Sequence, residues 1–278
     1  MPKFAANLTF LFKEYPFLER FAEAKIAGFD AVEVLFPYDD AANEIERRMK
    51  QSGLPLVLIN TPPPNWAGGD RGFAAIPGGE KRFRSDFTRA LRFAQRLGAL
   101  HIHIMAGKAQ GLVAKKTFVE NLKWAAAQAP KQSLTIEPIN PVDMPGYFLN
   151  DFDQAADIIE RVGAANLGLQ FDTYHAHAIT GDMLATWARH RRRVSHIQIA
   201  SVPGRHEPDQ GAIDYTAFFA QIDAEGYVGW VSAEYMPRGR TEDGTGWLSA
   251  SVTAPDQVLQ NPSAQDPAAR TGRATRLP

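Results

Sequence analysis

Eight short apolar runs recur along this chain, and helical patterns fill most of the intervals between them. In one interval Phe83, Phe87, Ala90 and Ala94 follow at three- and four-residue spacing, as on the buried face of a helix. Strands that alternate with helices form a parallel sheet with right-handed crossovers. Eight such units in 278 residues predict a single (β/α)8 TIM barrel, which typically takes about 250 residues. The predicted strands are 4–8, 31–36, 54–60, 100–106, 133–138, 166–172, 193–199 and 228–234.

A doubly wound open sheet is the rival architecture. It is disfavoured because neither a G-x-G-x-x-G nor a G-x-x-x-x-G-K motif follows the first predicted strand. The formal net charge of −1 gives no reason to expect nucleic acid or a membrane surface as a partner. The chain has no cysteine, no apolar run of the ~20 residues that a membrane span needs, and no signal-peptide pattern at its start. We therefore expect a soluble cytoplasmic protein, and homo-oligomerisation is left open.

Two stretches interrupt the alternation. Residues 61–80 are rich in proline and glycine and predict a long loop after the third strand, either a functional lid or a passive surface loop. Residues 249–278 are polar and lack any apolar period, which predicts a disordered tail. The expected organisation is one barrel domain over 1–248 followed by that tail.

Polar side chains stand at the ends of four of the predicted strands. Glu137, Asp172, Gln198 and Glu234 follow apolar runs and are 35, 26 and 36 residues apart, the period of a strand-helix unit. In a closed barrel such residues converge at one rim, where TIM-barrel active sites lie. Three carboxylates and an amide oxygen predict a site for a hard divalent cation, with Mg²⁺ or Mn²⁺ favoured. The alternative is that each acid is a structural partner of an arginine or lysine, or a helix cap.

Other polar residues near the predicted rim have weaker patterns. His196 and Gln198 alternate on one strand, so one of the two should supply an atom at the rim. Arg205 is placed to hold a carboxylate through its planar fork, although an exposed loop arginine is equally consistent with the sequence. Lys108, just beyond the fourth strand, is the lysine placed to reach the mouth and contact substrate. His101 and His103 are read equally well as barrel residues or as ligands.

Two glutamates on opposite sides of a bound hydroxy-carbonyl compound can move a proton between adjacent carbons. One glutamate removes the proton from the hydroxyl-bearing carbon, an enediolate forms, and the same or the other glutamate returns the proton to the neighbouring carbon. A cation held by the substrate oxygens stabilises the developing negative charge. This is aldose–ketose isomerase or epimerase chemistry.

Eight short segments along the chain match one known family. They are 4–8 (FAANL), 32–38 (VEVLFPY), 72–78 (GFAAIPG), 136–140 (IEPIN), 170–175 (QFDTYH), 196–200 (HIQIA), 203–208 (PGRHEP) and 234–235 (EY). Through these segments the chain resembles the hydroxypyruvate isomerase family, within the xylose isomerase-like TIM barrels, and the resemblance extends from residue 1 to about residue 248.

The resemblance implies a reaction and a set of roles. It implies conversion of hydroxypyruvate to 2-hydroxy-3-oxopropanoate (tartronate semialdehyde), with Glu137 and Glu234 as the proton-transferring pair. It implies Glu137, Asp172, Gln198 and Glu234 as metal ligands. By looser likeness to the ketose 3-epimerases, His175 and Arg205 would contact the small hydroxy-oxo acid.

Three alternatives stay open. Segment 101–107 resembles the 2-oxo-tetronate isomerases of the same family, which act on a four-carbon acid. The superfamily fold also hosts metal-dependent endonucleases, which need a basic face for phosphates that a net charge of −1 does not suggest. A non-catalytic sugar-acid binder is the third.

Overall fold

The computed structural model describes residues 2–63 and 65–252 of the chain. Within them, eight parallel strands are ordered β2-β1-β8-β7-β6-β5-β4-β3. The two ends of this order also meet, because Val57 N donates to Val32 O at 2.8 Å and Val34 N to Leu58 O at 3.1 Å. The sheet is therefore a nearly closed barrel, as predicted. The strands are β1 Lys3–Asn7, β2 Ala31–Glu33, β3 Leu58–Asn60, β4 His101–His103, β5 Ser133–Ile136, β6 Leu167–Asp172, β7 Val194–Ile199 and β8 Trp230–Ala233.

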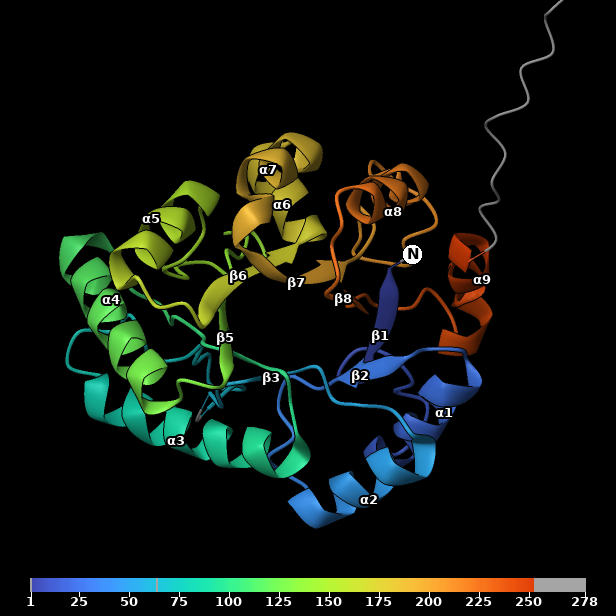
Figure 1. Ribbon diagram of the computed structural model, residues 1–278, viewed down its shortest axis with the longest axis horizontal. Helices are drawn as coiled ribbons and strands as arrows, with labels where there is room; N and C mark the ends of the chain where they lie inside the picture. The colour runs from blue at the N-terminus through green and yellow to red at the C-terminus, as the bar shows by residue number, and fades with distance from the viewer. Residues whose placement is uncertain (1, 64, 253–278) are drawn as a thin grey trace, which may run out of the picture.

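Helices form a ring around this barrel, with the strands inside it (Figure 1). The α-helices of the described residues are α1 Arg20–Ile26, α2 Ala42–Ser52, α3 Glu80–Leu97, α4 Gly111–Gln128, α5 Phe152–Val162, α6 Thr173–Thr180, α7 Met183–His190, α8 Tyr215–Ala224 and α9 Gly246–Val252. Short 3-10 turns lie at Phe17–Glu19, Arg191–Arg193 and Thr241–Gly244. No helix in the described part of the chain is long and apolar enough to cross a membrane.

Helix α3 illustrates how the sequence pattern produces the packing. Its predicted apolar residues Phe83, Phe87, Ala90 and Ala94 are all buried. Burying one such phenylalanine contributes about 1.5–3 kcal/mol. The helix ends at Gly98, which adopts the left-handed conformation with φ of 69° and so closes the last turn without a Cβ clash.

The observed strands are shorter than the predicted runs. The run 31–36 contains the strand Ala31–Glu33, and the run 100–106 contains His101–His103. Residues 34–35 and 104–106 of these runs follow the strands and are buried, but they lie outside the assigned strands. An apolar run indicates that a segment is buried. It does not separate a buried strand from a buried loop, because the two have similar compositions.

The structure describes most of the predicted loop 61–80 and only the first four residues of the predicted tail 249–278. Between Asn60 and Glu80 the described residues contain no helix or strand, which confirms the predicted long loop. Helix α9 runs from Gly246 to Val252 and so includes the first four residues of the predicted tail, and Trp247 and Leu248, just before the predicted boundary, are buried. Residues 253–278 lie outside the described part of the chain.

Candidate active site

The predicted strand-end residues meet at one end of the barrel. Glu137 follows β5, Asp172 ends β6, Gln198 lies near the end of β7 and Glu234 follows β8, and all four are buried. A cavity of about 190 Å³ opens beside them. Of the predicted site residues, Glu137, His175, Arg205 and Glu234 line this cavity, whereas Asp172 and Gln198 are not among its lining residues. The complete lining is Phe10, Leu35, Asn60, Trp66, Arg71, His103, Met105, Glu137, Ile139, Asp143, Met144, Gln170, His175, Arg205 and Glu234.

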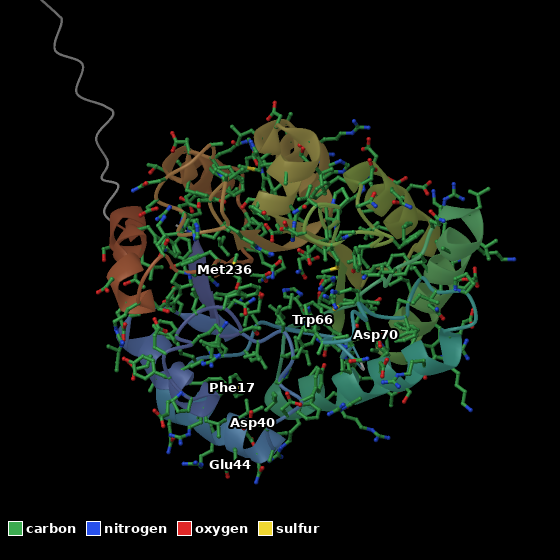
Figure 2. The ribbon with its side chains drawn as sticks, turned by 180° about the vertical axis from the view of Figure 1, so that it is seen from behind. Phe17, Asp40, Glu44, Trp66, Asp70 and Met236 are labelled. Carbon is green, nitrogen blue, oxygen red and sulfur yellow. The ribbon has the colours of Figure 1, made fainter. Side chains whose placement is uncertain are left out.

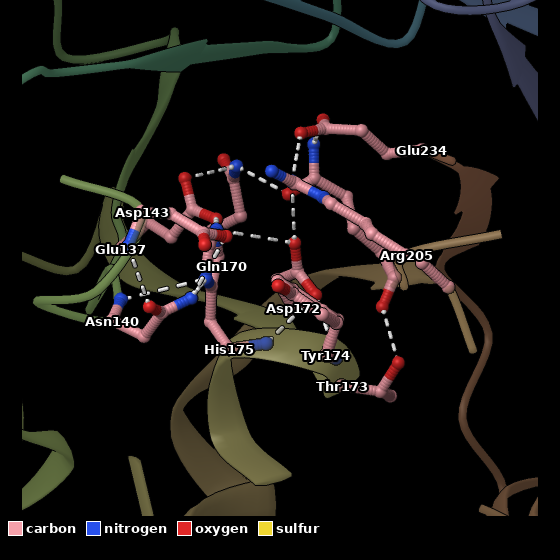
Figure 3. Close-up of polar contacts among 12 residues, drawn as sticks. Glu137, Asn140, Asp143, Gln170, Asp172, Thr173, Tyr174, His175, Arg205 and Glu234 are labelled. Carbon is pink, nitrogen blue, oxygen red and sulfur yellow. Dashed lines mark hydrogen bonds and ion pairs between the residues drawn. The ribbon is translucent and has the colours of Figure 1, made fainter. Parts of the chain in front are cut away.

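A chain of amide hydrogen bonds joins the two predicted catalytic glutamates. Gln170 donates from Nε2 to Glu137 Oε2 at 3.0 Å and to Gln198 Oε1 at 2.7 Å. Gln198 in turn donates to Glu234 Oε2. Glu137 and Glu234 therefore belong to one network that crosses the barrel from β5 to β8. Figure 3 shows Glu137, Gln170 and Glu234 converging with Arg205 and His175.

Arg205 is the cation at the centre of the acidic group. Its Nη2 donates to Glu234 Oε1 at 2.6 Å and to Asp172 Oδ2 at 3.1 Å. Its guanidinium also lies over the rings of Phe10 and Tyr174, at 5.3 and 5.2 Å. The backbone of Arg205 has φ of 55°, a left-handed conformation that is costly for a non-glycine residue. Such strain is retained where the surrounding contacts determine the position of the side chain.

Burial raises the pKa values of the clustered acids. For Glu137, burial acts together with repulsion from Glu234 and Asp172, and its pKa lies well above the ordinary value. The pKa of Glu234 is also raised well above the ordinary value by burial, against the opposing effect of Arg205. Burial likewise raises the pKa of Asp172 despite the same arginine. A buried acidic group of this kind is either partly protonated or neutralised by a cation.

Three of these side chains can hold a metal ion. Ligand atoms of Glu137, Asp172 and His175 all lie within 4.8 Å of one another, and all three residues are buried. The donor set is rich in carboxylate oxygen, which suits a hard divalent cation. The predicted ligand Gln198 has both ends of its amide engaged, since its Oε1 accepts from Gln170 and its Nε2 donates to Glu33 and Glu234. The cluster therefore differs from the predicted ligand set in containing His175.

The neighbours of His175 determine which of its ring nitrogens carries the proton. Asn140 Oδ1 accepts from the backbone N–H groups of Val142 and Asp143 at 3.1 and 2.9 Å. Asn140 Nδ2 must then point the other way, where it donates to His175 Nδ1 at 2.8 Å. An accepting Nδ1 leaves the proton on Nε2 of a neutral imidazole. Burial lowers the pKa of His175 well below its ordinary value, so the ring is neutral and Nε2–H is a donor facing the acids.

Several residues of this site were not predicted. Gln170, which links the glutamates, was placed in a strand but given no role. Glu33 is fully buried, accepts a hydrogen bond from Asn7 Nδ2 and contacts His196 Nε2 at 2.6 Å. The one sequence signal for it was a carboxylate inside the apolar run 31–36.

His103 lines the cavity, and neither of its ring nitrogens has a hydrogen-bond partner among the described residues. Its Nδ1 lies 3.6 Å from Glu137 Oε2. From the sequence, His103 was equally consistent with a barrel residue and with a ligand. Lys108, expected to contact substrate, is exposed and is not among the residues that line the cavity.

The chain is similar to known proteins over most of its length. The family model for xylose isomerase-like TIM barrels matches residues 21–251. The 2-oxo-tetronate isomerase of Cupriavidus necator is 48% identical over 254 residues, covering 89% of this chain and 98% of that protein. The hydroxypyruvate isomerase of Escherichia coli is 40% identical over 254 residues, with the same coverage of 89% and 98%. These matches confirm the predicted family and the predicted enzyme class, an isomerase.

A solved structure adds a different name. The crystal structure titled AP endonuclease, family 2, from Brucella melitensis superposes with a TM-score of 0.87 at 45% identity, covering 90% of this chain and 99% of that one. Relatives in this group therefore carry both isomerase and endonuclease names, so the choice between these two activities depends on the chemistry of the site.

Proposed function

This chain belongs to the xylose isomerase-like TIM barrel family, and on that premise we propose that it isomerises a small 2-oxo-3-hydroxy acid to its 2-hydroxy-3-oxo isomer. The observation that carries the proposal is the meeting of Glu137 and Glu234 in one cavity of about 190 Å³. At about 30 Å³ per water molecule, that volume is equivalent to about six waters. It suits a three- or four-carbon acid.

In this reaction a carboxylate takes the proton from C3 of the substrate, an enediolate forms, and the proton is returned at C2. The proton of the C3 hydroxyl passes to the oxygen on C2, so that C3 becomes the carbonyl carbon and C2 carries the hydroxyl. No other oxidant or reductant is needed, because the two carbons exchange oxidation states. Among the described residues no hydrogen bond reaches Glu137 Oε1, whereas both oxygens of Glu234 accept hydrogen bonds. We therefore assign the first proton transfer to Glu137, whose raised pKa suits a base working near neutral pH.

The residues present fit a divalent cation. Glu137 and Asp172 would hold it, with Glu234 and Gln198 as the other proposed ligands. His175 is not among them, because the proton on Nε2 and the hydrogen bond at Nδ1 leave it no free lone pair for a metal ion. An Mg²⁺ or Mn²⁺ ion held by these residues would supply a Lewis acid to polarise the substrate carbonyl. The Nε2–H of His175 faces Asp172 and Glu137 at 3.6 and 3.9 Å. From that position it can donate to a substrate oxygen and hold the enediolate in place.

Two substrates are candidates, hydroxypyruvate and 2-oxo-tetronate. The relative named for the four-carbon acid is 48% identical to this chain and the bacterial one named for the three-carbon acid is 40% identical, which favours 2-oxo-tetronate. Both acids should be assayed in both directions, with and without a chelator, and with Mg²⁺ or Mn²⁺ restored. Loss of turnover in the presence of the chelator, and its recovery when metal is restored, would support the proposal. Turnover unaffected by complete metal removal contradicts the role of the cation.

Cleavage at abasic DNA sites is the second candidate, because a structure 45% identical to this chain carries that name. A DNA-binding face needs several lysines or arginines to neutralise phosphates. The cavity lining has two, Arg71 and Arg205, and Arg205 is already paired with two carboxylates. Incision of an abasic duplex at a rate above that of the isomerisation would overturn the proposed function. A pure binder would release no product and incorporate no deuterium from D₂O into hydroxypyruvate.

A further inference from the structure

An acidic substrate brings a carboxylate into a cavity that is already rich in acids. Glu137, Asp143 and Glu234 line it, and Asp172 is hydrogen-bonded to Arg205, another lining residue. A second negative group is bound there only if a cation receives it. The metal ion proposed above is assigned to the substrate carbonyl, and the lining itself offers two permanently charged cations for the carboxylate, Arg71 and Arg205.

The positive charge of Arg205 is already paired with two carboxylates and is not available to the substrate. It is shared between Asp172 and Glu234, at N–O distances of 3.1 and 2.6 Å, so one positive charge faces two carboxylates. Moving it to the substrate would leave both acids without their partner. Removing one member of a buried ion pair is strongly unfavourable.

Arg71 is differently placed. Its Nη1 donates to the backbone oxygens of Trp66 and Asp70, at 3.0 and 2.8 Å. Among the residues the structure describes, Nε and Nη2 have no hydrogen-bond partner and no carboxylate lies within 4.0 Å of the guanidinium. Nε and Nη2 form one edge of the planar group, and that edge matches a carboxylate in a two-point contact.

The guanidinium is also held in position. It stacks on Trp66, with 3.8 Å between Arg71 Cζ and the ring centroid, and Trp66 packs on Phe36 with 5.2 Å between ring centroids. Figure 2 shows Trp66 near the centre of the ring of helices. A stacked guanidinium keeps its charge and loses little freedom when it binds.

The backbone beside Arg71 is fixed against the barrel. A Cβ on Gly72 would lie 2.2 Å from Met105 O, and Gly72 has φ of 97°, so only glycine allows this approach. Three residues later Ala75 N donates to Ala106 O at 2.7 Å. The loop 61–80 is thus anchored to the segment that follows β4, directly after the arginine.

We propose that Arg71 binds the carboxylate of the substrate and so makes the enzyme select acids over neutral keto sugars. This inference rests on the proposed function and deepens it. It gives the loop 61–80 a defined purpose, which is to carry one unpaired arginine and its stacking partner to the mouth of the cavity.

The test compares each acid with the neutral compound in which –CH₂OH replaces the carboxylate. Dihydroxyacetone is the counterpart of hydroxypyruvate, and erythrulose is the counterpart of 2-oxo-tetronate. In Arg71→Gln, kcat/KM for the acids should fall by roughly 10- to 150-fold, the value of one or two charged hydrogen bonds. The loss should appear mainly in KM, since the contact is the same in the ground and transition states. For the neutral compounds, kcat/KM, or Ki where turnover is too slow to measure, should change by less than about threefold.

Arg84→Gln is the matched control. Arg84 stacks on Trp124 at 5.1 Å but lies exposed on α3, away from the cavity. Its substitution should leave the preference for acids unchanged, and Arg71→Lys should restore part of it. If the wild-type enzyme isomerises the acids and Arg71→Gln keeps the same preference for acid over neutral compound, the role of Arg71 is refuted. If the wild-type enzyme turns over neither acid, the proposed function itself fails.

Discussion

Replacing Glu33 by glutamine should change how the stability of the protein depends on pH. Burial raises the pKa of Glu33 from 4.5 to about 7. Between these values the folded state holds a proton that the unfolded state has released, so wild-type stability falls as pH rises. At 1.36 kcal/mol per pKa unit the full effect is about 3 kcal/mol. The introduced glutamine carries no charge and keeps an oxygen that can accept from Asn7 and Gln198, so this part of the pH dependence should disappear.

The assay is urea unfolding at pH 5 and pH 8 with a chelator present, for wild type and for Glu33→Gln. The free energy of unfolding of the variant relative to wild type should rise by about 2.5 kcal/mol between the two pH values, since pH 5 lies slightly above the unfolded-state pKa. Any change in hydrogen bonding that the substitution causes contributes equally at both pH values, so it cancels from this difference. Glu120→Gln, at an exposed position on α4, is the control and should not alter the slope. Equal pH slopes in wild type and Glu33→Gln would refute the reasoning.

Three further predictions concern the site and its supports. Glu137→Gln and Glu234→Gln should each lower kcat by about 10²–10⁴-fold with unchanged circular dichroism, and near-normal kcat in either variant would exclude the two-glutamate mechanism. Asn140→Asp should lower kcat at least tenfold and shift the pH profile, because a carboxylate facing Nδ1 draws the proton of His175 away from Nε2; a twofold change or less would contradict the tautomer assigned here. Gly72→Ala should lower Tm more than Gly28→Ala, since both glycines have φ near 95° but only Gly72 has a backbone atom in the way; equal losses of Tm would show that the close approach to Met105 is unimportant.

The strand-end residues could be predicted because their signal is local. Glu137 and Glu234 each follow an apolar run, and the repeat of strand and helix brings successive strand ends to one rim. The same reasoning recognised that His196 and Gln198 share a face. It did not show which of the two side chains lies closer to the rim of the barrel. In the structure His196 pairs with Glu33, whereas Gln198 donates to Glu234.

The partners of those residues could not be predicted. Arg205 reaches Asp172 and Glu234 from a loop 33 and 29 residues away in sequence. Gln170 and Glu33 face the interior, but alternation along a strand gives two faces without saying which one points into the barrel. The unpaired edge of Arg71 is a property of everything around it, and no sequence pattern encodes it.

The sequence by itself determined the repeating unit, the number of strands, and which polar residues stand at strand ends. Each of these depends on the periodicity of neighbouring residues along the chain. Only the tertiary structure decided which charges are paired and which are free, because pairing depends on distances of a few ångströms between segments that the barrel brings together. That distribution of paired and unpaired charge is what separates an acid-binding site from a cluster of buried acids.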